Sequence, residues 1–194
     1  MRRSALSLAC LLVGACTVAS DPAGERAMSI VDLSGERRQP LEPKREARAN
    51  VLFFITTDCP IANAYAPELR AIIDAYASKG FDFYIVHVDP DLTVEAAREH
   101  ARLYGIDAAP ILIDAKHAFV RALGITITPE VAVVLRGAEL AYRGRIDDQW
   151  AELGQKRRAA RTHDLRAALD AVSSGQTIPR ARTAAVGCSV PVID

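Results

Sequence analysis

Apolar residues in this chain form short continuous runs that alternate with helically spaced ones, which predicts alternating strands and helices. Val51 to Ile55 is a continuous apolar run between polar residues, as expected for a central strand covered on both faces. After Pro60, apolar side chains recur at helical spacing as far as Tyr76, which predicts a helix that stops before Gly80. Pro67 lies inside this helix and predicts a kink.

The alternation continues along the rest of the chain. The further predicted strands are Ser29 to Leu33, Phe81 to Val88 and Ile111 to Ile113. The further predicted helices are Leu92 to Tyr104, Lys116 to Leu123 and Asp164 to Val172. Val131 to Leu135 and Leu140 to Arg143 flank a short turn and predict a hairpin, and Leu41 to Asn50 predicts a loop. Together these elements predict an α/β fold, a central mixed β-sheet flanked by helices.

The first residues differ from the rest. Arg2 and Arg3 precede the apolar stretch Ala5 to Val13, and small residues stand directly before Cys16. This pattern indicates an export signal, and its apolar stretch is too short for a permanent membrane span. The small residues before Cys16 resemble a bacterial lipobox. That resemblance implies that residues 1–15 are a signal peptide and that Cys16 is lipidated, whereas ordinary cleavage nearby would leave Cys16 incidental.

The length and composition favour one domain between two less regular ends. The chain has 194 residues, and half of them are apolar, enough for a core. Residues 16–27 are small and polar and predict a tether, 28–175 form the domain, and 176–194 form a tail without clear periodicity that carries Cys188. An acylated Cys16 would anchor the protein to a membrane on the periplasmic side of a bacterial cell envelope.

Charge and spacing exclude several functions. The sequence has 24 basic and 24 acidic residues, so loss of Arg2 and Arg3 leaves 22 basic against 24 acidic, a net charge of −2. Because no basic stripe is present, nucleic acid is not an expected partner. No zinc spacing and no glycine-rich phosphate loop occur, so the sequence predicts neither a cofactor nor a zinc ion.

The cysteines carry the candidate chemistry. Cys10 leaves with the signal and Cys16 would be lipidated, so Cys59 and Cys188 remain as thiols in an oxidising compartment. Cys59 stands where a buried strand meets a helix, and the partial positive charge of a helix N-terminus favours a thiolate. A CxxC motif would need a second cysteine where Ala62 stands.

These features resemble the thioredoxin-like superfamily, and within it the redoxin branch that includes the alkyl hydroperoxide reductase/thiol-specific antioxidant (AhpC/TSA) proteins. The resemblance rests on the strand–turn–Cys59-Pro60–helix, on Ile127-Thr128-Pro129-Glu130 directly before a strand, and on the closing hairpin and helix. It covers roughly residues 28–175. It implies a thioredoxin-like fold with a redoxin-type insertion, and a cis proline at Pro129 that faces Cys59.

Other segments refine the resemblance. Ala185-Val186-Gly187-Cys188-Ser189-Val190 is similar to the end of exported bacterial redoxin-domain proteins, which carry Asp-Cys-Pro-Ile near their start. Asp58 stands where a thioredoxin has an aromatic residue, and a carboxylate beside a thiol opposes ionisation. Thr56 matches the threonine of the peroxiredoxin motif Pro-x-x-x-Thr-x-x-Cys, but Leu52 occupies its proline position.

The first function that these residues indicate is an exported thiol–disulfide oxidoreductase. Cys59 would attack a protein or small-molecule disulfide, Cys188 would resolve the mixed disulfide, and an external reductant would complete the cycle. Thr128 and Pro129 would present the backbone to a strand-like substrate. The alternative is a static disulfide between Cys59 and Cys188 that attaches the tail to the domain.

The second function is antioxidant peroxide reduction. Cys59 would become a sulfenic acid, and Cys188 would condense with it. Thr56 would hydrogen-bond the peroxide, and Arg121 or Arg136 would support the thiolate.

The third function is copper binding. Soft sulfur ligands suit Cu(I), so Cys59 and Cys188 could act with a histidine, although no histidine stands in a recognisable motif. The candidates are His87, His100, His117 and His163. A non-catalytic binding domain is a further alternative.

Two charged segments have plainer interpretations. Arg143 to Asp148 follows a strand and predicts a turn and a helix cap. Trp150 and Lys156 to Arg158 predict a solvated segment.

Overall fold

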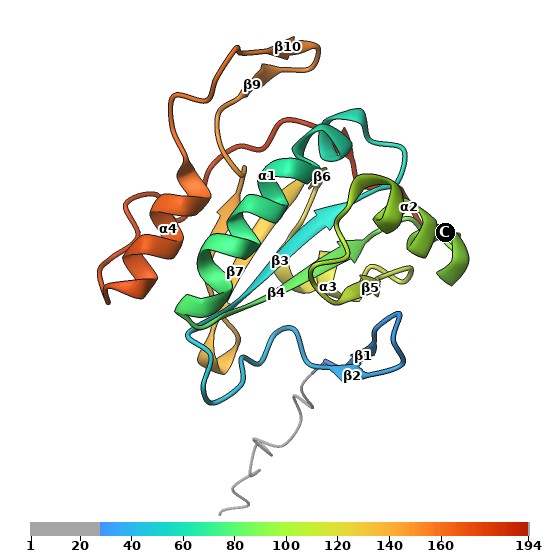
Figure 1. Ribbon diagram of the computed structural model, residues 1–194, viewed down its shortest axis with the longest axis horizontal. Coiled ribbons are helices and arrows are strands. Elements are labelled where there is room, and N and C mark those ends of the chain that lie inside the picture. Colours follow the sequence, from blue (N-terminus) through green and yellow to red (C-terminus); the bar gives the residue numbers. More distant parts are fainter. Residues whose placement is uncertain (1–27, 194) are drawn as a thin grey trace, which may run out of the picture.

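A five-stranded mixed sheet organises the protein, shown in Figure 1 as a computed structural model that describes residues 28–193. The strand order is β5-β4-β3-β7-β8. β4 runs parallel to both β3 and β5, whereas β7 runs antiparallel to both β3 and β8. The predicted mixed sheet is therefore confirmed. Its strands are β3 (Ala49–Ile55), β4 (Phe81–His87), β5 (Ile111–Ile113), β7 (Glu130–Leu135) and β8 (Glu139–Gly144).

Three two-stranded pairs surround the main sheet. β1 pairs with β2, β9 with β10, and β11 with β6, all antiparallel. Their bounds are β1 (Ile30–Val31), β2 (Arg37–Arg38), β6 (Ile127–Thr128), β9 (Trp150–Glu152), β10 (Gln155–Lys156) and β11 (Cys188–Ser189). The β9–β10 hairpin projects away from the sheet at the top of Figure 1, and Lys156 is exposed there as predicted. The prediction was wrong for Trp150, which is half-buried because its ring packs against the core cluster under α1 and α4.

Helices cover both faces of the sheet. α1 and α4 lie on one face and α3 lies on the other, as Figure 1 shows. The segment between β4 and β6 adds α2, β5 and α3 where an insertion was expected. The helices are α1 (Pro60–Tyr76), α2 (Val94–Tyr104), α3 (Ala118–Leu123) and α4 (Asp164–Ser173), with 3-10 turns η1 (Ala77–Lys79) and η2 (Arg136–Ala138).

The central strand β3 explains why the core has two halves. All seven of its residues are buried, and neighbouring side chains point to opposite faces of the sheet. Val51 and Phe53 pack in the cluster under α1 and α4, while Leu52 and Phe54 pack in the cluster around α3. The continuous apolar run read from the sequence therefore reflects a strand covered on both faces.

Two helices start later than predicted because particular side chains fix their first turns. α2 begins at Val94, since the hydroxyl of Thr93 accepts a hydrogen bond from the Ala96 N–H at 3.1 Å. α3 begins at Ala118, since the buried carboxylate of Asp114 accepts from the backbone N–H groups of the first three helical residues.

The predicted signal peptide (1–15), the lipidation site Cys16 and the tether (16–27) lie outside the described residues. Within residues 28–193, no helix has the length and apolar character needed to cross a membrane.

The tail runs along the domain instead of leaving it. The Arg143 N–H donates to the Ala181 carbonyl at 3.0 Å, and the Thr183 N–H donates to the Arg143 carbonyl at 3.2 Å. The tail, red in Figure 1, then crosses to β6, where Cys188 pairs with Thr128. The sequence did not predict this strand, because two residues show no periodicity.

Candidate functional site

Cys59 occupies the junction between β3 and α1. It is the N-cap residue of α1, and Pro60 takes the first helical position, where a missing N–H costs no hydrogen bond. The Cys59 carbonyl accepts the first helical hydrogen bond from the Asn63 N–H at 3.0 Å. Although Asp58 and Pro60 are exposed, the Cys59 side chain is 0% exposed.

The loop that contains Thr128 and Pro129 faces this cysteine. The Cys59 thiol donates a hydrogen bond to the Thr128 carbonyl, with 3.1 Å between sulfur and oxygen. The peptide bond between Thr128 and Pro129 is cis, as the resemblance implied. The hydroxyls of Thr128 and Thr56 lie 3.4 Å apart. Four residues that the sequence singled out therefore lie close together, namely Thr56, Cys59, Thr128 and Pro129.

Cys188 completes the group. In β11 it pairs with Thr128, whose hydroxyl lies 3.4 Å from the Cys188 carbonyl, and the Val190 N–H donates to the Thr126 carbonyl at 3.0 Å. The Cys188 side chain packs against the core cluster that contains Cys59, and both cysteines are free thiols. The tail thus brings its cysteine to the N-terminal end of α1.

The surroundings of Cys188 favour its protonated thiol over the thiolate. Burial raises the pKa of Cys188 to about 12, and the neighbouring Cys59 and Asp58 act in the same direction. Because the thiolate is the nucleophile in disulfide exchange, Cys188 is poorly suited to attack a substrate first.

A polar network on the other side of Cys59 holds the loop after β3. The Thr57 N–H and hydroxyl both donate to the Asp89 carboxylate, and the Thr57 carbonyl accepts from the Asn63 amide at 3.0 Å. Burial favours the protonated Asp89 carboxyl, but the nearby His87 and the hydrogen bonds from Thr57 outweigh burial and lower the pKa of Asp89. Thr57, Asn63 and Asp89 stand in no sequence motif and were not predicted, whereas His87 was named only as a candidate copper ligand.

Two buried histidines, His87 and His100, adjoin this network. The His100 Nε2 is 2.9 Å from the Asn63 amide oxygen, and the rings of His87 and His100 meet edge to face at 5.1 Å. Burial, with His87 acting in the same direction, lowers the pKa of His100 to about 4, against the opposing charge of Asp89. The His87 ring is 0% exposed, and its Nδ1 is 3.6 Å from the Asp89 carboxylate.

The remaining predicted candidates lie elsewhere. His117 contacts the Val88 carbonyl at 2.7 Å, and His163 groups with two carboxylates, so within residues 28–193 no histidine hydrogen-bonds either cysteine. Arg121 is exposed on α3. Arg136 follows the far end of β7 from Pro129, roughly 20 Å away for a strand of that length. The described contacts therefore do not place either arginine beside Cys59.

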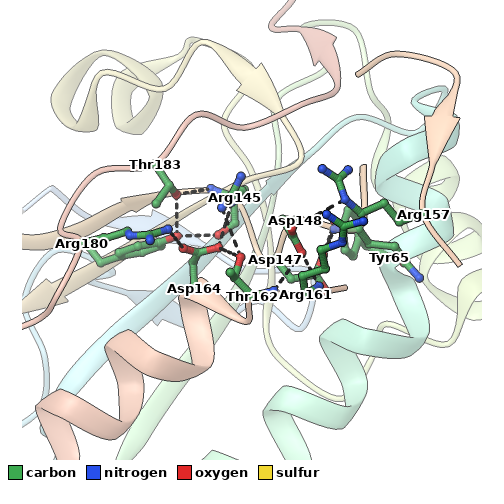
Figure 2. Close-up of polar contacts among 12 residues, drawn as sticks. Tyr65, Arg145, Asp147, Asp148, Arg157, Arg161, Thr162, Asp164, Arg180 and Thr183 are labelled. Carbon is green, nitrogen blue, oxygen red and sulfur yellow. Dashed lines mark hydrogen bonds and ion pairs between the residues drawn. The ribbon is translucent and has the colours of Figure 1, made fainter. Parts of the chain in front are cut away.

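The segment from Arg143 to Asp148 contains more than the predicted turn and cap. Figure 2 shows two adjoining networks built on it. In one, the buried Asp147 accepts a hydrogen bond from the Tyr65 hydroxyl at 2.6 Å. In the other, Arg145 pairs with Asp164 at 2.9 Å. Buried Asp147 and half-buried Arg145, two positions apart in the sequence, therefore find their partners on α1 and α4.

The second network also holds the tail. The Thr183 hydroxyl accepts a hydrogen bond from the Arg145 N–H at 3.1 Å and lies 2.8 Å from the Tyr142 hydroxyl. Arg180 lies 3.6 Å from Asp164. Figure 2 shows Thr183 and Arg180 joined to this network through Arg145 and Asp164.

Comparison with known proteins agrees with this geometry. The redoxin family model matches residues 22–160. A hypothetical protein from Sinorhizobium meliloti is 25% identical at a TM-score of 0.70, with 84% of this chain and 89% of that chain covered. An uncharacterized conserved protein from Geobacillus kaustophilus is 24% identical at a TM-score of 0.71, with 86% and 90% covered.

A third solved structure is more distant. StoA from Bacillus subtilis is 18% identical at a TM-score of 0.51, and the match covers 60% of this chain and 84% of that chain. The likeness to StoA shows a shared fold. No curated protein sequence matches this chain.

Proposed function

The chain belongs to the redoxin family of the thioredoxin-like superfamily, and from this premise we propose that it is an exported thiol–disulfide oxidoreductase. Thiol-based redox chemistry follows from the family. In the proposal, Cys59 is the nucleophile, Cys188 is the resolving cysteine, and Thr128 and Pro129 bind the substrate backbone.

The observation that supports this proposal most is the pairing of β11 with β6. It pairs Cys188 with Thr128, whose carbonyl accepts the hydrogen bond of the Cys59 thiol, and Cys188 packs against the core cluster that contains Cys59. A resolving cysteine must reach the sulfur that carries the mixed disulfide, and the position of Cys188 opposite Thr128 supports this role. Thr56 supports the site through Thr128, since its hydroxyl lies 3.4 Å from the Thr128 hydroxyl.

The first step of the proposed reaction forms a mixed disulfide. The Cys59 thiolate attacks one sulfur of the substrate disulfide, so a Cys59–substrate bond forms and the substrate S–S bond breaks. The second substrate sulfur leaves as a thiolate and takes a proton from water.

The second step releases the substrate. Cys188 attacks the Cys59 sulfur, and its proton passes to the departing substrate sulfur. The substrate has then gained two electrons and two protons, and the protein has lost them to form a Cys59–Cys188 disulfide. An external dithiol reduces this bond and restores both thiols.

Export of the protein and its attachment to a membrane through Cys16 are part of the same proposal. A lipid chain on Cys16 would tether the domain at the periplasmic side of the envelope, where disulfides persist. Radiolabelled fatty acid incorporated into wild-type protein, and absent from Cys16→Ser, would test the anchor. Label retained in Cys16→Ser would contradict it.

A trapping experiment tests the chemistry. Reduced protein is mixed with oxidised glutathione, and disulfides are mapped by mass spectrometry. Cys188→Ser should accumulate a Cys59–glutathione disulfide, because the second step is blocked. The wild type should instead accumulate the Cys59–Cys188 bond, and Cys59→Ser should form neither.

The matched control is Ser189→Ala, which changes an exposed residue of the same strand. It should behave as the wild type. The proposal is wrong if Cys59→Ser forms a glutathione adduct at Cys188 as fast as Cys188→Ser forms one at Cys59.

A further inference from the structure

We propose that the tail segment Gly187–Val190, here called the strap, occupies the site where an extended protein substrate docks. The strap would then compete with substrate and shield Cys59. Substrates would be extended protein segments with a glycine directly before the reacting cysteine. This inference rests on the proposed function and adds to it a substrate class and a means of control.

The strap makes the contacts that a docked strand would make. It runs antiparallel to β6, with Cys188 opposite Thr128 and Ser189 opposite Ile127. The Val190 N–H donates to the Thr126 carbonyl at 3.0 Å. Main-chain hydrogen bonds of this kind give affinity to an extended segment but do not by themselves select its sequence.

The residue before the cysteine supplies the sequence preference. A Cβ added to Gly187 would lie 2.0 Å from the Thr128 oxygen, 2.7 Å from its carbonyl carbon and 3.1 Å from the Pro129 Cδ. These neighbours belong to the backbone and to a proline ring, so they cannot rotate away. A substrate in the same register therefore needs glycine at this position.

The strap also explains why Cys59 is buried. Cys59 is 0% exposed although the residues on either side of it are exposed. Val186 and Cys188 pack against the same core cluster that contains Cys59. A substrate disulfide can reach the Cys59 sulfur only after the strap moves away.

The strap has an anchor from which it can move. Thr183 is held by the Tyr142 hydroxyl at 2.8 Å and by the Arg145 N–H at 3.1 Å. Ala184 is exposed and Ala185 is half-buried, so few side-chain contacts hold the chain between anchor and strap. The strap can thus leave β6 while Thr183 keeps it close, which makes it an efficient competitor at a high effective concentration.

Alkylation of the reduced full chain tests the shielding. The rate at which iodoacetamide labels Cys59 is followed by peptide mass spectrometry. Gly187→Ala should raise this rate about ten-fold or more, because the added Cβ displaces the strap. Val190→Pro should do the same at a different position, because proline lacks the N–H that bonds Thr126.

Each variant has a matched control in the same tail. Ser189→Ala keeps the backbone of the strap, and Val192→Pro lies beyond the paired residues at an 89% exposed position. Both controls should label at the wild-type rate, and unfolding curves should show that all four variants are folded. If Gly187→Ala and Val190→Pro both label Cys59 at the wild-type rate, the shielding is wrong.

Peptide exchange tests the substrate class. The peptide Ala-Val-Gly-Cys-Ser-Val, linked to thionitrobenzoate through its cysteine, is added to Val190→Pro, and release of thionitrobenzoate is followed. It should react about ten-fold faster than the same peptide with valine in place of glycine. Equal rates would overturn the glycine requirement.

The two tests distinguish this inference from the proposed function on which it rests. If neither peptide reacts at Cys59 while alkylation of Val190→Pro is still faster than in the wild type, then the proposed function and the substrate class are wrong and the shielding holds.

Discussion

The Cys59 thiol donates its hydrogen bond to the backbone carbonyl of Thr128, 3.1 Å away, and not to a side chain. Thr128 is also the residue that pairs with Cys188 in β11. One residue of the Pro129 loop therefore contacts the candidate nucleophile and positions the strand that carries the candidate resolving cysteine. This relationship links the chemistry of the site to the docking of an extended chain.

Thr56→Val should separate disulfide exchange from peroxide reduction. The Thr56 hydroxyl contacts the Thr128 hydroxyl at 3.4 Å, a weak hydrogen bond, and valine has nearly the same shape. We expect the rate of exchange with oxidised glutathione to fall by less than about three-fold, and the free energy of unfolding to fall by about 1 kcal/mol.

Peroxide chemistry gives the opposite expectation, since there Thr56 would bond the peroxide itself. A ten-fold or greater loss of hydrogen peroxide reactivity at Cys59, with exchange unchanged, would favour the peroxide function. Stopped-flow measurement of both reactions on one preparation would distinguish the two.

The stability of the fold should fall in acid because of His100. Its ring is buried, and burial and His87 lower the pKa of His100 from 6.5 to about 4. Between pH 6.5 and about 4, His100 binds a proton in the unfolded chain but stays neutral in the folded protein. Stability that is fully present above pH 6.5 should therefore decrease by up to about 3 kcal/mol as the pH falls to about 4.

Urea unfolding curves between these pH values measure the effect. His100→Gln should flatten the dependence, because the glutamine does not titrate. His163→Gln, at an exposed histidine, should keep it. The assignment to His100 fails if the two variants show the same slope.

Tyr65→Phe should cost more stability than Tyr76→Phe. The Tyr65 hydroxyl donates at 2.6 Å to Asp147, which is buried, whereas the Tyr76 hydroxyl donates at 2.8 Å to the exposed Asp170. A buried carboxylate that loses a donor cannot recover it from water. We expect losses of about 2 and about 0.5 kcal/mol in the free energy of unfolding.

Chemical denaturation of the two variants gives this comparison directly. Equal losses would show that water reaches Asp147 and that the network of Figure 2 is not closed to solvent.

Gly144→Ala should loosen the anchor of the tail. Gly144 has a φ of +152°, and a Cβ there would lie 2.1 Å from the Thr183 hydroxyl and 2.4 Å from the Thr183 carbonyl oxygen. Thr183 must move to admit it. We expect a loss of at least about 2 kcal/mol in stability and a slower formation of the Cys59–Cys188 bond.

Gly137→Ala is the matched control, since Gly137 also has a positive φ, +73°, but has nothing within 4 Å of an added Cβ. It should cost about 1 kcal/mol from backbone strain alone. If both glycine variants form the disulfide at the same rate, Thr183 does not position the tail.

Long, strongly patterned elements could be predicted from sequence. The apolar run of β3 and the helical spacing of α1 depend on neighbours in the chain, so their type and position are encoded locally. The turn at Cys59 and the loop before Pro129 were found because their residues match a known family pattern. Helix starts were displaced by two residues where Thr93 and Asp114 cap the helices.

The pairing that completes the site could not be predicted in the same way. β6 and β11 have two residues each, and the Thr128 hydroxyl meets the Cys188 carbonyl across 60 positions of the chain. Burial of Asp147 likewise depends on Tyr65, 82 positions away. In the tail, the sequence singled out the Gly187-Cys188 pair. The pairing of Cys188 with Thr128 could be recognised only in the structure.

The reduction potential of the Cys59–Cys188 pair tests the central claim most directly. Wild-type protein is equilibrated in a series of redox buffers, quenched, and mapped for this disulfide. A catalytic pair should be half oxidised between roughly −270 and −120 mV, the range of thiol–disulfide oxidoreductases. A potential below about −300 mV would instead indicate a static disulfide that attaches the tail, and no bond between these cysteines at any potential would contradict the resolving role of Cys188.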